Sequence, residues 1–231
     1  MSHATYTKVG YQIPNFTYPG VQPDGLFEAV ADQAVAAEQS GFDTVFVMDH
    51  FFQLPQIGTP DQEMFDAYTL LGAIAARTQT ARLGTLVTGV TYRNPAQLAK
   101  AVTALDVVSR GRALLGIGAA WFDVEHEALG FRFPPLRERH QMLREALEIC
   151  TAMFRNERSS YAGTHFSITD AYNNPRPIQP GGPPIMVGGN GEKVTFRIAA
   201  QYADELNMGC SPVEIPRKID ALRGHLSLIH I

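Results

Sequence analysis

The sequence predicts an α/β protein built on a parallel sheet, and three observations carry this prediction. Short runs rich in β-branched and apolar residues repeatedly precede amphipathic helical windows, which is the order of βα units with right-handed crossovers. One run, residues 43–48, is almost continuously apolar, as in a strand covered on both faces. The chain has 231 residues, 45% hydrophobic and 18% charged, which is enough to bury a full core in one domain.

The first strand is expected over residues 8–13 and the first helix over residues 24–40. One face of that helix is apolar at helical spacing: Leu26, Val30, Ala34 and Ala37. Gly41 ends this helix as a C-terminal glycine. The second unit combines the apolar run 43–48 with a helix over residues 64–77.

The third unit begins with a strand over residues 82–88. Asn94 and Pro95 then mark a helix start, because an N-cap side chain is followed by a first-turn proline. The apolar face of this helix is Leu98, Val102, Leu105 and Val108. The fourth strand is expected over residues 113–117, and a long helix follows over residues 136–155. That helix is expected to bury Leu143, Leu147, Cys150 and Phe154.

The same long helix carries basic residues, of which Arg144 is placed to pair with Glu148 one turn later. The basic residues expected to face solvent are Arg137, Arg139, His140 and Arg144. A small hairpin around Ala162 and Gly163 is expected next, followed by irregular Pro- and Gly-rich chain. The remaining expected segments are residues 161–168 for the hairpin, 173–184 for the irregular chain, 184–187 and 204–208 for strands, and 193–202 and 213–226 for helices.

Six units in a row fit two architectures. One is an open doubly wound sheet, and the other is a (β/α)8 barrel that is short by two units. Hydrophobic periodicity does not choose between them.

The charge balance excludes several classes of partner. Nineteen Lys and Arg against 23 Asp and Glu give a net charge of −4, so we expect no nucleic-acid partner. The chain lacks a signal-peptide core, an 18-residue apolar run and a basic amphipathic helix, so we expect no membrane partner and a soluble, cytoplasmic protein. Cys150 and Cys210 have no CxxC spacing and suit a reducing compartment. The seven histidines form no HExxH or HxH pattern, so no metal site is expected.

Four segments at strand ends are candidates for chemistry. Asp49 and His50 follow the apolar run 43–48, where ligands of parallel α/β proteins sit, and a histidine there can exchange a proton near neutral pH. The glycines and threonines of residues 83–89 indicate a bulge or a place where another backbone or a ligand approaches closely, or else tight helix–sheet packing. Residues 188–193 (GGNGEK) lie between a strand and a helix, where backbone N–H groups form a phosphate cradle; a simple tight turn is the alternative.

The fourth segment, residues 116–121 (GIGAAW), is a poor dinucleotide fingerprint because Trp121 stands where the third glycine would be. It can still be a loop over a flat aromatic ligand, with Trp121 as a wall. The acidic and histidine residues 125–127 are interpreted instead as a solvated helix face.

Six segments, in this order, resemble the bacterial luciferase-like superfamily and, within it, the branch of coenzyme F420-dependent oxidoreductases. They are VFVMDH at 45–50, LGTLVTGVTYRNPAQLAK at 83–100, LDVVSRGRALLGIG at 105–118, WFDVEHEALG at 121–130, PPIMVGGNGE at 183–192 and AAQYADELNM at 199–208. The resemblance extends over most of the chain, from residue 8 to residue 225. It implies a (β/α)8 barrel with a flavin-like ring across its C-terminal mouth.

The resemblance also implies roles for individual residues. His50 matches a catalytic or cofactor-adjacent histidine, and Asp49 matches an aspartate that contacts the deazaflavin. The strand of Thr85, Leu86 and Thr88 matches a bulge that backs the ring, often with a cis peptide bond, and the nearest register of the resemblance places this bond at Thr85–Leu86. The residues expected to bind the cofactor are Asp49, Thr85, Leu86, Thr88, Trp121, Gly188, Gly189, Asn190 and Gly191, the glycines holding its phosphate end.

Three functions follow from this resemblance. The first is hydride transfer between coenzyme F420 and a small organic substrate, with His50 stabilising or protonating the developing charge. The second is an FMN-dependent monooxygenase that needs a flavin reductase as partner. The third is a non-catalytic relative that binds the cofactor without turnover. A homodimer is implied by the resemblance alone.

Two departures from the family pattern matter. Sugar-phosphate dehydrogenases of this branch carry an acid directly after the glycine motif, where this chain has Ala120 and Trp121, so sugar-phosphate oxidation is disfavoured. Family members also continue for about two more βα units. We therefore predict one domain over residues 1–225, which forms a barrel truncated after about six units, and a non-native tail over residues 226–231 (LSLIHI). One expected consequence of this truncation is a chain without enzymatic activity.

Overall fold

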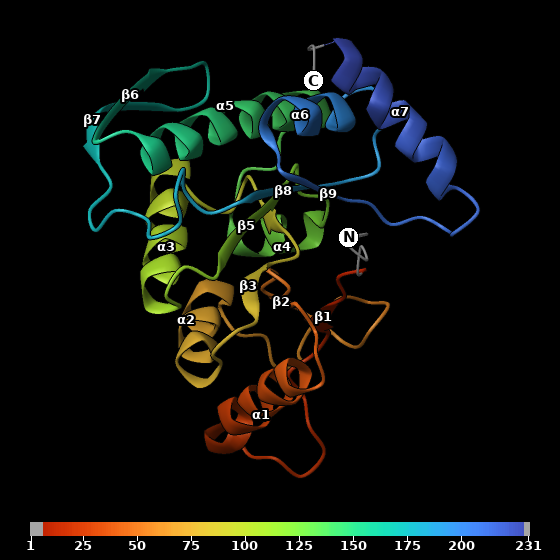
Figure 1. Ribbon diagram of the computed structural model, residues 1–231. Coiled ribbons are helices and arrows are strands. Elements are labelled where there is room, and N and C mark those ends of the chain that lie inside the picture. Colours follow the sequence, from red (N-terminus) through yellow and green to blue (C-terminus); the bar gives the residue numbers. More distant parts are fainter. Residues whose placement is uncertain (1–6, 229–231) are drawn as a thin grey trace, which may run out of the picture.

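The computed structural model describes residues 7–228 and contains the predicted parallel sheet, curled into an open arc of a barrel (Figure 1). The strands run in the order β1 (Gly10–Ile13), β2 (Thr44–Val47), β3 (Arg82–Thr85), β5 (Ala113–Gly118), β8 (Ile185–Gly188) and β9 (Glu205–Asn207). Each strand is parallel to its neighbour, and the short β4 (Thr88–Gly89) also pairs with β5. The barrel alternative is therefore the correct one, and the described residues form part of its wall.

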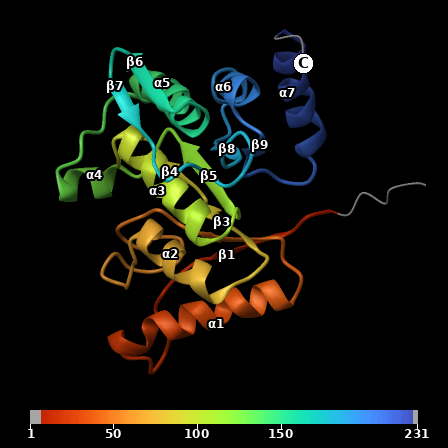
Figure 2. The ribbon, with the colours of Figure 1, turned by 60° about the vertical axis from the view of Figure 1, so that its left-hand side comes forward.

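Most of the helices form a layer along the outer side of this arc, and the last one packs on the helix before it (Figure 2). In chain order they are α1 (Leu26–Gln39), α2 (Ala67–Arg77), α3 (Pro95–Val108), α4 (Asp123–Leu129), α5 (Leu136–Arg155), α6 (Thr195–Tyr202) and α7 (Ile215–Leu228). A 3-10 turn at Pro23–Gly25 precedes α1, and the β-hairpin of β6 (Arg158–Ala162) and β7 (Ser167–Tyr172) follows α5. None of the helices within residues 7–228 is long and apolar enough to cross a membrane.

Most predicted element boundaries are confirmed to within a few residues, and local chemistry explains why. The Asn94 side chain accepts a hydrogen bond from the N–H of Ala96 at 2.9 Å, which is the predicted N-cap. The predicted bounds of α5 are correct, and its buried residues include Leu143, Leu147, Cys150 and Phe154. The predicted inward position of Val108 is wrong, because its side chain is 54% exposed at the end of α3.

The strand predicted over residues 82–88 is interrupted at its centre. It divides into β3 and β4, and Leu86 and Val87 between them are joined by a cis peptide bond. The predicted position of that bond, Thr85–Leu86, is wrong by one residue. Before this break β3 pairs with β5, and Gly84 lies opposite Leu114.

Glycines allow the strands to approach one another inside the arc. A Cβ atom on Gly84 would lie 2.8 Å from the carbonyl oxygen of Leu114, and one on Gly116 would lie 1.9 Å from that of Thr85. The close-approach interpretation of residues 83–89 is thus confirmed. The inner side of the arc holds a small apolar cluster separate from the main core: Phe46, Leu114 and Met186, with Leu86 against it.

An ion pair between the non-adjacent strands β3 and β9 shows that the sheet curves strongly. Arg82 at the start of β3 donates to Glu205 at the start of β9, with 2.8 Å between Nη2 and Oε1. These strands are three places apart in the sheet, a separation of about 14 Å if the sheet were flat. Within residues 7–228, β1 and β9 pair on one side only, so the arc does not close. Residues 226–228 of the predicted tail continue α7, and residues 229–231 lie outside the described part of the chain.

Candidate functional site

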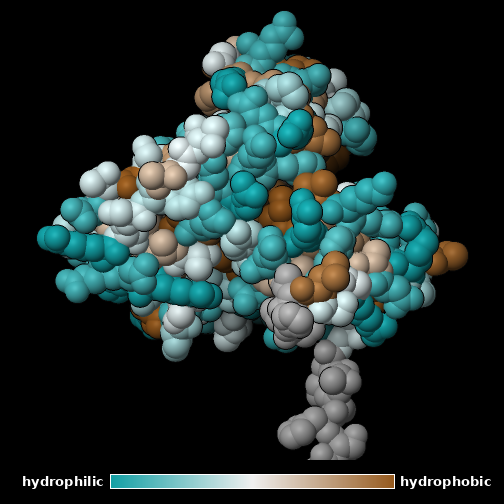
Figure 3. Space-filling view, turned by 90° about the horizontal axis from the view of Figure 1, so that it is seen from above, coloured by the Kyte–Doolittle hydropathy of each residue, from teal (hydrophilic) through white to brown (hydrophobic). Residues whose placement is uncertain are grey.

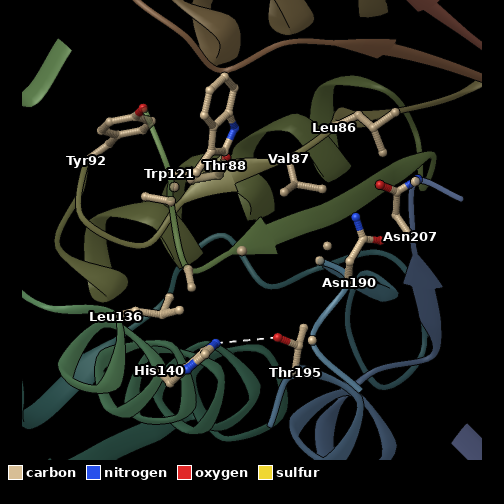
Figure 4. Close-up of a pocket in the computed structure, with 18 of the residues that line it drawn as sticks. Leu86, Val87, Thr88, Tyr92, Trp121, Leu136, His140, Asn190, Thr195 and Asn207 are labelled. Atoms are coloured by element: carbon tan, nitrogen blue, oxygen red, sulfur yellow. Dashed lines mark hydrogen bonds between the residues drawn. The ribbon is translucent and has the colours of Figure 1, made fainter. Parts of the chain in front are cut away.

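A cavity of about 410 Å³ opens at the C-terminal ends of the strands (Figure 4). Eight of the predicted site residues line it: His50, Leu86, Thr88, Trp121, Gly188, Gly189, Asn190 and Gly191. Asp49 and Thr85 lie outside its lining and are buried. The parallel arrangement accounts for this convergence, because the loops that follow parallel strands all emerge at one end of a barrel.

His50 is fixed by a buried carboxylate that the sequence analysis interpreted as solvated. Its Nδ1 lies 3.0 Å from Oε2 of Glu125, which is fully buried at the start of α4. The same Oε2 accepts a hydrogen bond from the hydroxyl of Tyr92 at 2.6 Å. The other carboxylate oxygen accepts the backbone N–H groups of Phe51 at 2.5 Å and Phe52 at 2.8 Å. This places the His50 proton on Nδ1 and leaves Nε2 available to a ligand.

The electrostatics of Glu125 follow from these contacts. Burial by itself would raise the pKa of the Glu125 carboxyl. Hydrogen bonds from His50, Tyr92 and the Phe52 N–H outweigh burial, so the pKa is lowered and the group is ionised at neutral pH. Burial and the same carboxylate raise the pKa of Tyr92, which keeps its hydroxyl a donor. The interpretation of residues 125–127 as a solvated face is therefore wrong for Glu125 and His126, which are buried.

Asp49 is occupied by a neighbouring arginine instead of facing the cavity. Its carboxylate is hydrogen-bonded to Arg93, which also contacts Asp66 at 2.9 Å. Burial raises the pKa of Asp49, and the Arg93 guanidinium opposes that shift. The Arg93 guanidinium also lies over the ring of Tyr68, 4.9 Å from its centre. The bond to Arg93 gives Asp49 a role in positioning the loop after β2, and its direct contact with a cofactor stays a prediction.

The wall behind the cavity is the interrupted strand. Thr85 donates from Oγ1 to the carbonyl oxygen of Gly116 at 2.9 Å, and its hydroxyl is also 2.9 Å from that of Thr88. The hydroxyl of Tyr68 lies 2.8 Å from the Thr88 hydroxyl on the other side. These contacts hold the strand ends on both sides of the break, and Leu86 and Val87 face the cavity between them (Figure 4).

The glycine loop after β8 forms a second wall with exposed backbone. A Cβ atom on Gly188 would lie 2.7 Å from Cγ2 of Val87, and Gly189 has a φ of 142°, which favours glycine. Gly189 donates its N–H to Asn207 at 2.9 Å. Within residues 7–228, the N–H groups of Asn190 and Gly191 have no hydrogen-bond acceptor in the protein. They precede α6, so the loop presents free donors at a helix N-terminus.

Sequence reasoning predicted Trp121 in the remaining walls of the cavity but missed Tyr92, Leu136, His140 and Thr195. Trp121 and Tyr92 stand on one side of the cavity, while Leu136, His140 and Thr195 form its floor (Figure 4). His140 Nε2 is 3.4 Å from the Thr195 hydroxyl, and burial together with the neighbouring Arg139 lowers the pKa of His140. Arg139, expected in solvent, is buried and donates to the carbonyl oxygen of Ala120 at 2.6 Å.

No group of three or more metal-ligating side chains occurs in the part of the chain that the structure describes. The polar groups of the cavity are two histidines, tyrosine and threonine hydroxyls, amides and backbone N–H groups. Such a lining suits an organic ligand with a flat apolar part and an anionic part.

Comparisons with known proteins agree with this geometry. Residues 7–226 match the family described as luciferase-like monooxygenase. An F420-dependent glucose-6-phosphate dehydrogenase of Kineococcus radiotolerans is 38% identical over 167 residues, covering 72% of this chain and 48% of the relative. The chain thus spans about half the length of the curated relatives that it matches first.

Solved structures share the fold. Monooxygenase RslO1 from Streptomyces bottropensis has a TM-score of 0.79 and 24% identity, with 96% of this chain and 66% of that one covered. An F420-dependent secondary alcohol dehydrogenase, solved with an F420-acetone adduct, has a TM-score of 0.77 and 23% identity, with 95% and 64% covered. At these identities the likeness establishes the fold alone.

Proposed function

Because the chain belongs to the luciferase-like monooxygenase family, we propose that it is the cofactor-binding part of an oxidoreductase that transfers hydride between coenzyme F420 and a small organic substrate. The observation that carries this proposal is the His50–Glu125 pair at the cavity, with Nδ1 tied to a buried carboxylate at 3.0 Å. Curated relatives named as F420-dependent support the choice of cofactor.

The residues present fit such a cofactor. Leu86 and Val87 offer an apolar wall to a flat ring, with Trp121 across the cavity. At the other end, the free N–H groups of Asn190 and Gly191 suit a phosphate. A side chain at position 188 would clash with Val87, so the loop stays close to that wall only with glycine there.

When bound, a deazaflavin supplies hydride chemistry at a ring carbon and reacts poorly with oxygen, because carbon replaces the reactive flavin nitrogen. The residues of the protein would transfer the proton that the substrate loses or gains along with the hydride. With its ring proton on Nδ1, His50 can accept a proton at Nε2 from a substrate hydroxyl as hydride leaves the carbon, and the imidazolium so formed can return that proton in the reverse direction. Glu125 positions this nitrogen, since its carboxylate holds the Nδ1 proton of the ring. Trp121 and Phe122 flank the ring of His50, with centroids 5.7 and 5.8 Å away.

One segment of the cavity lining argues against a sugar phosphate as the substrate. Residues 119–121 (Ala, Ala, Trp) pass the cavity without an acid, and Ala120 there has a φ of 59°. We therefore expect no oxidation of glucose 6-phosphate, although relatives are named for it. A secondary alcohol or its ketone is a suitable first substrate to assay.

A fluorescence titration tests the cofactor. The purified chain is titrated with oxidised F420 and, separately, with FMN. Saturable binding of F420, with FMN bound at least about tenfold more weakly, is expected. Preference for FMN, together with oxygen consumption when a flavin reductase is supplied, would overturn the proposal in favour of a monooxygenase. Cofactor binding without turnover, unaffected by His50→Ala, would instead identify a non-catalytic relative.

A further inference from the structure

A second cavity, of about 720 Å³, lies between α5 and α6 next to the first. Leu136 and His140 line both cavities, so the second continues from the floor of the first. The helices α5 and α6 lie side by side in both ribbon views (Figures 1 and 2). We call this cavity the arginine groove, and its lining is Leu136, Arg137, His140, Gln141, Arg144, Val194, Arg197, Ile198 and Gln201.

The lining follows a helical repeat on both sides. On α5, Arg137, Gln141 and Arg144 are spaced by four and three residues and share one face. On α6, Arg197 lies between Val194 and Gln201 at the same kind of spacing. The distance along α5 from residue 137 to residue 144 is about 10 Å at 1.5 Å per residue. The groove contains three arginines and no acid.

These arginines lack the partners that other surface arginines have. Within residues 7–228, Arg137, Arg144 and Arg197 form no ion pair, whereas Arg77 pairs with Glu28 at 2.8 Å. The predicted Arg144–Glu148 pair is not formed, because Glu148 accepts hydrogen bonds from two tyrosine hydroxyls. Those hydroxyls belong to Tyr161 and Tyr202, each 2.5 Å from the carboxylate. Glu192, the acid in the glycine loop, is likewise paired, with Arg217 at 2.7 Å.

The surroundings of the arginine groove favour an anionic chain as its occupant. Seen from above α5, α6 and α7, the surface is mostly hydrophilic, with hydrophobic residues near its centre (Figure 3). Burial and Arg139 lower the pKa of His140, so the positive charge at neutral pH comes from the three guanidinium groups. Guanidinium groups bind carboxylates with paired N–H donors. The glycine loop that suits a phosphate ends at Val194, where the α6 side of the groove begins.

We propose that the arginine groove binds the carboxylate chain of the cofactor. This proposal rests on the proposed use of F420. F420 carries an oligoglutamate chain beyond its phosphate, so a ring in the first cavity and a phosphate on the glycine loop would direct that chain toward Val194. Two helical turns of groove accommodate two to three carboxylates. The arginine groove thereby distinguishes cofactor forms by chain length, independently of the chemistry at His50.

Binding affinities test this proposal without any catalytic readout. The dissociation constants of F420 carrying several glutamates and of F420 carrying none are measured by fluorescence at about 0.02 M and about 0.5 M NaCl. The glutamates should lower the dissociation constant of F420 about tenfold at low salt, and most of this difference should disappear at high salt. The variant Arg137→Gln/Arg144→Gln/Arg197→Gln should bind both forms equally. Arg155→Gln, an exposed arginine of α5 outside the groove, is the matched control and should keep the advantage.

Equal affinity of the wild-type chain for both forms would overturn the proposal, as would an advantage that survives the triple substitution. Failure of F420 itself is distinguished by a free γ-linked tetraglutamate, followed by NMR shifts of residues in α5 and α6. Shifts that the triple variant abolishes would support the groove even if the deazaflavin ring does not bind. If F420 does not bind and tetraglutamate causes no shifts, both the proposed role of the arginine groove and the proposed function are overturned.

Discussion

At the scale of single residues, the site depends on a carboxylate that collects donors from separate parts of the chain. Glu125 accepts hydrogen bonds from His50, from the two backbone groups after it, and from Tyr92. A buried carboxylate with four donors is well stabilised, whereas removal of its charge leaves those donors competing for fewer lone pairs. The tautomer of His50 is therefore set by a residue 75 positions later in the sequence.

We predict that Glu125→Gln changes the His50 tautomer. The amide can donate to Nδ1, so the ring proton moves to Nε2. Side-chain ¹⁵N NMR of His50 reports this directly, and turnover should fall about 10²-fold or more because the acid–base nitrogen is altered. Glu127→Gln, exposed on the same helix, is the control and should leave the spectrum unchanged. An unchanged His50 spectrum in Glu125→Gln would contradict the assignment.

Sequence reasoning located part of this site and missed the rest for a physical reason. His50 and the glycines near residue 189 were found because strand ends and glycine loops have local signals. Glu125 was missed because nothing in a local window tells a buried acid from a solvated one. Its burial depends on a contact with His50, and that distance is set by the sheet. Arg93 was missed in the same way, since its partner Asp49 is 44 residues away.

At the scale of elements, long periodic segments were predicted best. The apolar stripe of α5 gives both its ends correctly, because 20 residues repeat the pattern several times. Helix α4 has seven residues and too few repeats to be delimited from sequence. The glycines of residues 83–89 and the family resemblance both indicated an irregular strand, and only the structure places the cis bond at Leu86–Val87. The hairpin was found from its glycine, although its strands extend further on both sides.

The hairpin gives a prediction about acid pH. The Glu145 carboxylate of α5 accepts the N–H groups of Thr164, His165 and Phe166 at 2.9, 2.9 and 3.0 Å. Burial alone would raise the pKa of Glu145, but these hydrogen bonds outweigh it and lower the pKa below the ordinary 4.5. The stabilisation is therefore complete above about pH 4.5 and is lost as the pH falls through the lowered value.

Hydrogen exchange of residues 164–166, corrected for intrinsic rates, should show weaker protection at about pH 3 than at pH 6. Glu145→Gln should remove this pH dependence. Glu157→Gln, an exposed change just before the hairpin, is the control and should retain it. Equal protection at both pH values in the wild-type chain would show that the carboxylate does not anchor the hairpin.

At the scale of the whole molecule, the open arc determines behaviour in solution. Strands β1 and β9 each pair on one side in the described residues, and an unpaired edge is a template for another chain. Val9 beside β1 is 51% exposed, which adds apolar surface at that edge. A closed barrel of eight strands has no such edge. Exposed edges of this kind favour contacts between copies of the chain.

We predict that the chain associates with itself as its concentration rises. Sedimentation velocity should show a growing fraction of dimers or larger species, and Val9→Lys should reduce it because a charge at an edge opposes strand pairing. Val213→Lys replaces a residue that is 89% exposed in the loop before α7 and belongs to no strand, and it should have no such effect. A monomer at all concentrations, with a sharp thermal transition, would contradict this prediction.

The order of the strands also determines how the lining of the first cavity can vary in sequence. Every residue that lines the first cavity belongs to the arc from β2 to β9 or to the loops and helices that follow these strands. The proposed cofactor wall is thus built from loops that follow neighbouring strands of one arc. Substitutions in these loops change what the cavity contacts, while the strands and the core beneath them stay in place. Ligand preference can therefore diverge in sequence without a change of fold.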